Sequence, residues 1–255
     1  MTSVLFGSLP LPGQGGDQLV SKAVTAAIAA LFKRTQKLEA TVRAEPVAKL
    51  LQGSADGFDF IGQGLLMYSG LRVEAMELYV QAVSIDFGAI FKGQVSLRRP
   101  TQATMRIVLS EEDLTASFNT PFLMKKLHQV EYAGQALHFQ RTQITLNADK
   151  SMRMQSSIRL GDAVDSVDID ITAHLQVENR RKIQFVDVVY GGNPQAVELA
   201  QVLTHHLNNL LDLDEFALDG LQLRIDQLRL RNKQLTFYGV AQIDHFPQRK
   251  ESAAA

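Results

Sequence analysis

The stretch from Gly70 to Leu123 decides the fold, and it reads GLRVEAMELYVQAVSIDFGAIFKGQVSLRRPTQATMRIVLSEEDLTASFNTPFL. Two runs with strand-like alternation, Leu71–Ala82 and Thr101–Leu109, flank a bend and lead directly into an amphipathic helix. Ser110 can accept a hydrogen bond from a free backbone N–H at the start of this helix, and Asp113 can bond back to it. The stretch therefore predicts long strands joined to a capped helix.

The helix that follows Ser110 carries Leu114 and Phe118 on one face. Its end is predicted near Asn119-Thr120-Pro121, because a proline either breaks a helix or begins a new one. No residue pattern in this part of the chain is typical of catalysis. The pattern here therefore predicts structure and not catalysis.

The composition is that of an ordinary globular protein. The 255 residues are 45% hydrophobic and 21% charged, and the formal net charge is -1. A chain of this length can bury a substantial core, and its balanced charge argues against a dedicated nucleic-acid-binding protein. Because there is no cysteine, disulfides, thiolate catalysis and cysteine-ligated metal sites are excluded.

The two ends of the chain are predicted to lie outside the folded part. Residues 1–16 are rich in glycine and proline, which predicts a flexible leader, and 247–255 are predicted to form a disordered tail. A single domain is expected over 17–246. The leader lacks the features of a signal peptide, and the most apolar run, Leu19–Phe32, is too short to span a bilayer. The prediction is a cytoplasmic protein, with peripheral membrane contact left open.

Two long helices are expected outside the opening stretch. The first follows Asp17 as N-cap, carries apolar residues from Leu19 to Phe32, and closes with Lys33 and Arg34. Small residues widen its apolar surface, so it is either a core helix or a helix that faces lipid. The second begins at Pro194 after the cap residue Asn193.

Most of the remaining chain has the alternation of antiparallel strands. Residues 166–177 alternate most regularly, while 130–139 and 142–148 are predicted as two separate strands. The apolar phase changes between Ala75 and Met76, and again between Ile225 and Leu228. Such a change indicates a bulge or a strand whose two faces are buried in different places. The expected fold class is α+β, with a long, strongly curved antiparallel sheet wrapped around one or two long helices.

Residues with catalytic or metal-binding chemistry do not form a recognisable group. His205 and His206 are adjacent on a helix and cannot face one ligand together, and no HExxH, GxSxG or P-loop pattern occurs. Asp168 and Asp170 fall on the solvent-facing side of a strand, opposite Asp165, and solvation explains all three. No catalytic residue, metal site or cofactor is predicted.

Short basic clusters occur at the ends of predicted elements. Lys33-Arg34 and Arg98-Arg99 are the clearest of them. They are either solvated chain ends or contacts for anionic lipid headgroups, where each cation contributes about 1 kcal/mol.

The opening stretch resembles the LmeA-like phospholipid-binding proteins of bacteria. The matching residues are Gly70-Leu71-Arg72-Val73, Arg99-Pro100, Leu109-Ser110-Glu111, Asp113-Leu114, Asn119 and Pro121. The resemblance covers about 40–125 and implies a fold similar to the tubular lipid-binding (TULIP) domains, in which a curved sheet and a long helix leave an apolar groove. It supplies no catalytic residue.

From this resemblance we expect non-catalytic binding, with transfer as a further option, of a phospholipid or similar amphipathic lipid. A lipid-modifying enzyme and a scaffold with a self-filled groove are the alternatives. The residues predicted to line the groove are Leu19, Ala23, Ile28, Leu31, Phe32, Leu114, Phe118, Phe122 and Leu123. Lys33, Arg34, Arg98 and Arg99 are predicted to contact the headgroup or the membrane.

Overall fold

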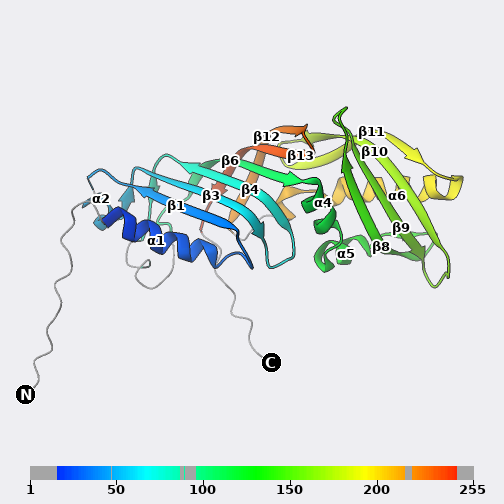
Figure 1. The fold of residues 1–255 in the computed structure, drawn as a ribbon, viewed down its shortest axis with the longest axis horizontal. Helices are drawn as coiled ribbons and strands as arrows, with labels where there is room; N and C mark the ends of the chain where they lie inside the picture. Colours follow the sequence, from blue (N-terminus) through cyan, green and yellow to red (C-terminus); the bar gives the residue numbers. More distant parts are fainter. Residues whose placement is uncertain (1–15, 47, 87–88, 90–95, 216–219, 246–255) are drawn as a thin grey trace, which may run out of the picture.

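Two antiparallel sheets lie end to end along an elongated molecule (Figure 1). The structure, a computed structural model, describes residues 16–46, 48–86, 89, 96–215 and 220–245. The predicted leader, except Gly16, and the predicted tail therefore lie outside the described residues. Every strand pair recorded is antiparallel, and the first sheet is strongly curled, which confirms the predicted fold class.

The first sheet joins strands from both ends of the chain in the order β1-β3-β4-β6-β13-β12. Its C-terminal hairpin pairs with β6 over the whole length of that strand, from Thr101 to Ser110. The two ends of the chain are thus held in one sheet. The strands are β1 (Lys37–Arg43), β3 (Gly57–Leu66), β4 (Arg72–Val80), β6 (Thr101–Ser110), β12 (Leu221–Arg231) and β13 (Gln234–Ile243).

The second sheet has the order β11-β10-β9-β8-β7. The separate strands predicted over 130–139 and 142–148 are wrong, because one strand, β8, runs through both. A register shift between Phe139 and Arg141 lets this one strand continue through the region. The strands are β7 (Glu131–Tyr132), β8 (Gln135–Leu146), β9 (Met152–Leu160), β10 (Ser166–Glu178) and β11 (Lys182–Gly191).

Smaller elements complete the first half of the chain. The helix α2 (Ala48–Leu51) leads into a two-stranded ribbon made of β2 (Ser54–Ala55) and β5 (Val83–Ser84).

The helix α1 (Gly16–Ala29) packs on β1 and buries Val24 and Ile28. Its predicted end at the basic residues is wrong. The backbone N–H of Lys33 donates to the Leu66 carbonyl oxygen at 2.8 Å, so the chain after the helix already pairs with the end of β3. That pairing is incompatible with continued i→i−4 bonding, and the helix ends at Ala29.

The helix α6 (Pro194–Leu210) packs against the second sheet, where it contacts β10 and β11. Its predicted start is confirmed: Asn193 Oδ1 accepts a hydrogen bond from the Ala196 N–H at 2.9 Å. Leu199, Ala200 and Leu207 are fully buried along its apolar face. Burial against the sheet therefore holds this helix in place.

The predicted capping box at Ser110 is confirmed. Ser110 Oγ accepts from the Asp113 N–H at 3.0 Å and begins α4 (Glu111–Phe118). Pro121 then begins a second helix, α5 (Pro121–Leu127), with Thr120 as its N-cap. Of the two outcomes expected for this proline, a restart is the one that occurs.

One polar stripe on α4 completes the free edge of β8. Glu111, Thr115 and Asn119 accept hydrogen bonds from the N–H groups of Leu146, Ile144 and Thr142, at 2.8, 3.0 and 2.9 Å. The spacings agree, because four helical residues rise about 6 Å and two strand residues about 6.7 Å. The helix between the two sheets is thereby fastened to the second one.

The phase changes in the strands have two different origins. In β12 the first of the two predicted explanations, a bulge, is present, with a register shift between Ile225 and Gln227. The Ile225 N–H donates to the Arg180 carbonyl oxygen at 2.7 Å. In β4 the register is continuous. There the alternation places Val73 on one face, where it is buried, and Leu78 on the other face, where it is half-buried.

Candidate functional site

A cavity of about 250 Å³ lies where the first sheet meets the second. Strands β4, β6, β12 and β13 form one wall, α4 and α5 a second, and residues of β9, β10, β11 and the loop after α6 a third. The lining residues are Met67, Leu71, Arg72, Val73, Met76, Leu78, Met105, Ile107, Leu109, Leu114, Ser117, Phe118, Leu123, Met152, Leu175, Ile183, Phe185, Leu211, Leu213, Leu221, Leu223, Ile225, Leu235, Phe237 and Ala241.

The lining is almost entirely apolar. Of these 25 residues, Arg72 and Ser117 are the two with polar side chains, and the other 23 are hydrophobic. A cavity with such walls retains an apolar occupant by excluding water, and its few polar groups can only orient that occupant.

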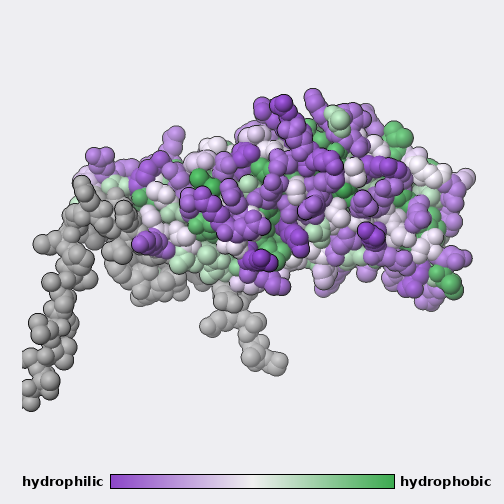
Figure 2. Space-filling model, in the orientation of Figure 1, coloured by the Kyte–Doolittle hydropathy of each residue, from purple (hydrophilic) through white to green (hydrophobic). Residues whose placement is uncertain are grey.

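Many of the lining side chains are incompletely covered. The half-buried ones are Met67, Leu71, Met76, Leu78, Ile107, Leu109, Leu175, Leu211, Leu213, Leu221 and Leu223. On the face shown in Figure 2, hydrophobic residues break the polar surface between the end of the β3–β4 hairpin and α4. Part of the apolar lining is therefore accessible to a ligand from solvent.

Methionine is concentrated in this cavity. The chain has seven methionines, and Met67, Met76, Met105 and Met152 are four of them. Methionine is unbranched and has three rotatable side-chain bonds, so it can follow an occupant of irregular shape. Four of the lining side chains are therefore of the most flexible apolar type.

The helix α4 supplies the middle of the lining. The side of the helix next to the stripe that bonds β8 presents Leu114, Ser117 and Phe118 to the cavity. The capping box and the bonds to β8 fix the rotation of the helix about its axis. These polar contacts outside the cavity thus determine which side chains face into it.

The polar lining residues lie together at the start of β4. The backbone N–H of Arg72 donates to Ser117 Oγ at 3.2 Å, which joins β4 to α4. The Arg72 side chain is exposed at this point, whereas Ser117 is 9% exposed. One end of the cavity is therefore polar and open to solvent.

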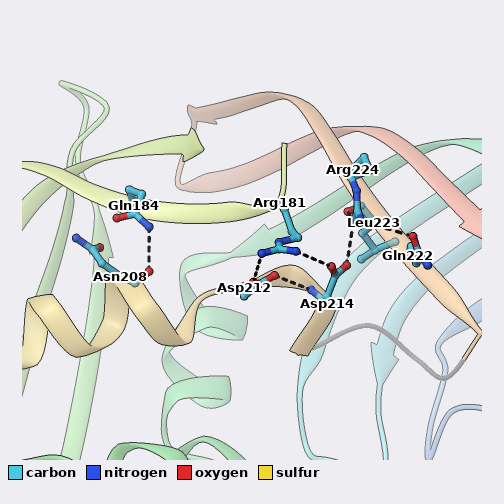
Figure 3. Close-up of polar contacts among 8 residues, drawn as sticks. All are labelled: Arg181, Gln184, Asn208, Asp212, Asp214, Gln222, Leu223 and Arg224. Atoms are coloured by element: carbon cyan, nitrogen blue, oxygen red, sulfur yellow. Dashed lines mark hydrogen bonds and ion pairs between the residues drawn. The ribbon is translucent and has the colours of Figure 1, made fainter. Parts of the chain in front are cut away.

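Ion pairs hold the third wall against the first sheet (Figure 3). Arg181 pairs with Asp212 at 3.0 Å and with Asp214 at 3.4 Å, and Asp214 also pairs with Arg224 at 2.8 Å. These residues alternate with Leu211, Leu213 and Leu223, which face the cavity. The network therefore keeps the apolar loop after α6 in the cavity wall.

Groups with shifted pKa values lie outside the cavity. Burial of the Arg106 guanidinium opposes its charge, but bonds to Tyr238 and Glu77 outweigh this, so its pKa is raised. Arg106 lies on the face of β6 opposite Met105 and Ile107, which line the cavity. Among the described residues, the other groups with a shifted pKa are Asp56, Tyr79, Tyr132, Asp149 and Arg153, and none of these five lines the cavity.

The structure brings three of the predicted groove residues together. Leu114, Phe118 and Leu123 line the cavity. Phe122 is half-buried outside the lining, with its ring 5.7 Å from the Lys126 ammonium.

The described groove residues predicted in and directly after α1 lie outside the cavity lining. Ile28 and Phe32 are buried in the core, where Phe32 stacks on Phe60 with ring centroids 6.4 Å apart, and Leu31 is half-buried. The side chains of Leu19 and Ala23 lie outside the described residues. Because Phe60 is opposite Ala40 and Leu78 in register, α1 covers one end of the sheet face whose other end borders the cavity.

The residues predicted to contact a headgroup are exposed but do not line the cavity. Lys33 and Arg34 follow α1, and Arg98 donates to the Gln52 carbonyl oxygen at 3.1 Å beside the exposed Arg99. Sequence reasoning did not select Arg72, although it is the cation in the Gly70–Val73 motif. The sequence feature that could have identified Arg72 is its position directly before the first apolar residue of β4.

In the described part of the chain, no three His, Cys, Asp or Glu side chains are placed to bind a metal ion together. No helix among those residues combines the length and the apolar character needed to cross a membrane.

Comparison with known protein families gives a match over most of the chain. The family model described as LmeA-like phospholipid-binding matches residues 12–240, which is nearly the whole chain. No curated protein and no solved structure matches the chain.

Proposed function

We propose, from the premise that the chain belongs to the LmeA-like phospholipid-binding family, that it holds the acyl part of its lipid in the cavity between the two sheets. Lipid binding itself follows from the family. The observation that carries the location is the lining, in which 23 of 25 residues are hydrophobic.

The physical driving force is burial of the acyl chain. Each methylene moved from water into an apolar wall contributes about 0.8 kcal/mol. The volume of about 250 Å³ is just below the roughly 300 Å³ at which ligand pockets usually begin. One acyl chain therefore enters first, and rotation of the four methionines makes room for more of the lipid.

Three residues predicted from the sequence are proposed as direct contacts. Leu114, Phe118 and Leu123 present apolar side chains from α4 and α5 to the bound chain. The buried residues around α1 instead complete the core on the neighbouring part of the sheet.

We further propose that the protein binds the lipid without altering it. General acid–base or nucleophilic catalysis needs a nucleophile beside a base. Ser117 is the one hydroxyl in the described lining, and its recorded contact is the N–H of Arg72, with no histidine or carboxylate in the lining. This lining favours retention and release of a lipid over turnover.

The test compares two substitutions on one strand. Leu223 and Leu228 are both half-buried on β12, but Leu223 lines the cavity and Leu228 does not. Leu223→Glu places a carboxylate among apolar groups, so it should lower phospholipid retention at least tenfold, whereas Leu228→Glu should retain the wild-type amount. Native mass spectrometry and lipid extraction of the purified full chain measure both.

Equal retention by the two variants would reject the cavity as the binding place. A wild-type protein that carries no phospholipid and takes none from liposomes would reject the proposal as a whole. Conversion of a labelled phospholipid to product would instead support the enzyme alternative.

A further inference from the structure

The polar end of the cavity contains two hydrogen-bond donors to which the described residues offer no acceptor. Arg72 is the first residue of β4, and no hydrogen bond or ion pair is recorded for its guanidinium among the described residues. Most arginines around the sheet junction are paired, as Arg180, Arg181 and Arg224 are. A guanidinium with five donors that borders an apolar cavity is available for a ligand.

The second donor is the buried hydroxyl of Ser117. It accepts a hydrogen bond from the Arg72 N–H, and its own proton has no recorded acceptor in the described part of the chain. With 9% exposure and an apolar surrounding, this donor loses free energy unless something bonds to it. An occupant with an oxygen acceptor at this end would satisfy it.

The backbone holds these donors in place. Gly70, directly before β4, has φ +90, and a Cβ there would lie 2.9 Å from the side chain of Thr120. The turn is closed by a hydrogen bond from the Met67 N–H to the Leu71 carbonyl oxygen at 2.8 Å. The β3–β4 turn is thus pressed against the joint between α4 and α5, and Arg72 emerges at a fixed point.

Because the remaining walls are apolar, they allow a bound lipid only one orientation in the cavity. The contributions of β11 and of the loop after α6 are Ile183, Phe185, Leu211 and Leu213, all apolar. A polar group placed there would be buried without a partner. The acyl chain therefore belongs toward β11, and the polar group toward the β3–β4 turn.

We propose that Arg72 and Ser117 bind the phosphate group of the lipid, an inference that rests on the proposed function. A phosphate offers oxygen acceptors to both donors, and the planar guanidinium fits it with two parallel hydrogen bonds. The lipid is then held by its phosphate at the β3–β4 turn, with its acyl chain running between the sheets. The chemical class selected is a phosphate-bearing lipid, rather than a neutral glyceride or a fatty acid.

The test uses two soluble lipids with identical acyl chains, dioctanoylphosphatidylglycerol and dioctanoylglycerol, titrated into the purified full chain by calorimetry. The wild type should bind the phospholipid about tenfold more tightly than the glyceride, since one charge-assisted contact is of that size. Arg72→Gln keeps the length and polarity but loses the charge, so it should remove most of this preference. Arg159→Gln, an exposed arginine on β9 outside the cavity, is the matched control and should keep it.

The outcomes separate the two proposals. Glyceride binding that persists in Arg72→Gln, together with a lost phospholipid preference, supports the phosphate contact. Equal affinity of the wild type for both lipids, an unchanged preference in Arg72→Gln, or tighter binding of octanoate than of the phospholipid would overturn it while leaving the apolar cavity intact. A wild type that binds neither lipid would overturn the proposed function itself. Ser117→Ala should reduce phospholipid affinity severalfold with little change for the glyceride.

Discussion

Truncation of the Phe118 side chain tests whether bound lipid occupies the cavity. Phe118 is 6% exposed on α4, and its ring forms part of the cavity wall. Phe118→Ala therefore removes packed surface and enlarges a space that already exists. The lipid-free variant should be less stable than the lipid-free wild type, and bound lipid should reduce the difference.

The magnitude follows from the position of the ring. A buried Phe→Ala change costs about 3–5 kcal/mol, and the cost rises with the volume left empty. Because one side of this ring already faces a hollow, fewer contacts are lost and we expect about 3 kcal/mol without lipid. An acyl chain that moves into the vacated space recovers about 2 kcal/mol, at about 0.8 kcal/mol for each methylene buried.

The assay is urea unfolding of delipidated protein with and without saturating dioctanoylphosphatidylglycerol. Phe139→Ala is the control, because Phe139 is 5% exposed on β8 and does not line the cavity. Its loss of about 4 kcal/mol should be the same with and without lipid. Phe118→Leu, a milder change, provides the same comparison if the alanine variant does not fold.

The reasoning is refuted if lipid leaves the Phe118→Ala loss unchanged. It is also refuted if lipid reduces the loss in Phe139→Ala by the same amount, since the effect would then be general stabilisation by ligand and not filling of this cavity.

Two further predictions concern the second sheet. Asn119→Ala removes the side chain that hydrogen-bonds to both the backbone N–H and the backbone C=O of Thr142. Urea unfolding should therefore show that the free energy of unfolding falls by about 2 kcal/mol. A fall of less than about 0.5 kcal/mol would contradict the role of α4 in covering β8. Hydrogen bonds from the side chain and backbone of Ser151 lower the pKa of Asp149 below its ordinary value, so the stabilising contribution of this carboxylate is present above its unfolded-state pKa and is lost as pH falls through the folded-state pKa. A carboxyl NMR titration should show that lowered pKa, and Ser151→Ala should raise it; an unchanged titration would contradict the assignment.

Features set by a few neighbouring residues could be predicted from the sequence. The capping box at Ser110 and the N-cap at Asn193 depend on contacts within their own helix. The same is true of the regular alternation in β10, whose Ile169, Ile171 and Ala173 are buried as predicted. Local geometry dictates these features whatever the rest of the chain does.

Features set by distant partners could not be predicted. The helix α1 ends at Ala29 because Lys33 bonds to Leu66, and the free edge of β8 is completed by side chains from α4. Neither partner is marked in the sequence near the residue it affects. For the same reason, the apolar residues of α1 and of α4 looked equivalent, although those of α4 border the cavity and the described ones of α1 do not.

The sequence by itself determined the α+β class, the capped helix after Thr101–Ser110 and, through the motif around Gly70–Pro121, the phospholipid-binding family. The tertiary structure decided where the apolar side chains leave a space, because an apolar residue has the same pattern whether its neighbour is another side chain or a cavity. It also decided that Arg72 borders that space. Ser117, which lies next to Arg72 where α4 contacts β4, is 45 residues further along the chain. Only the packing of α4 on β4 brings the two residues together.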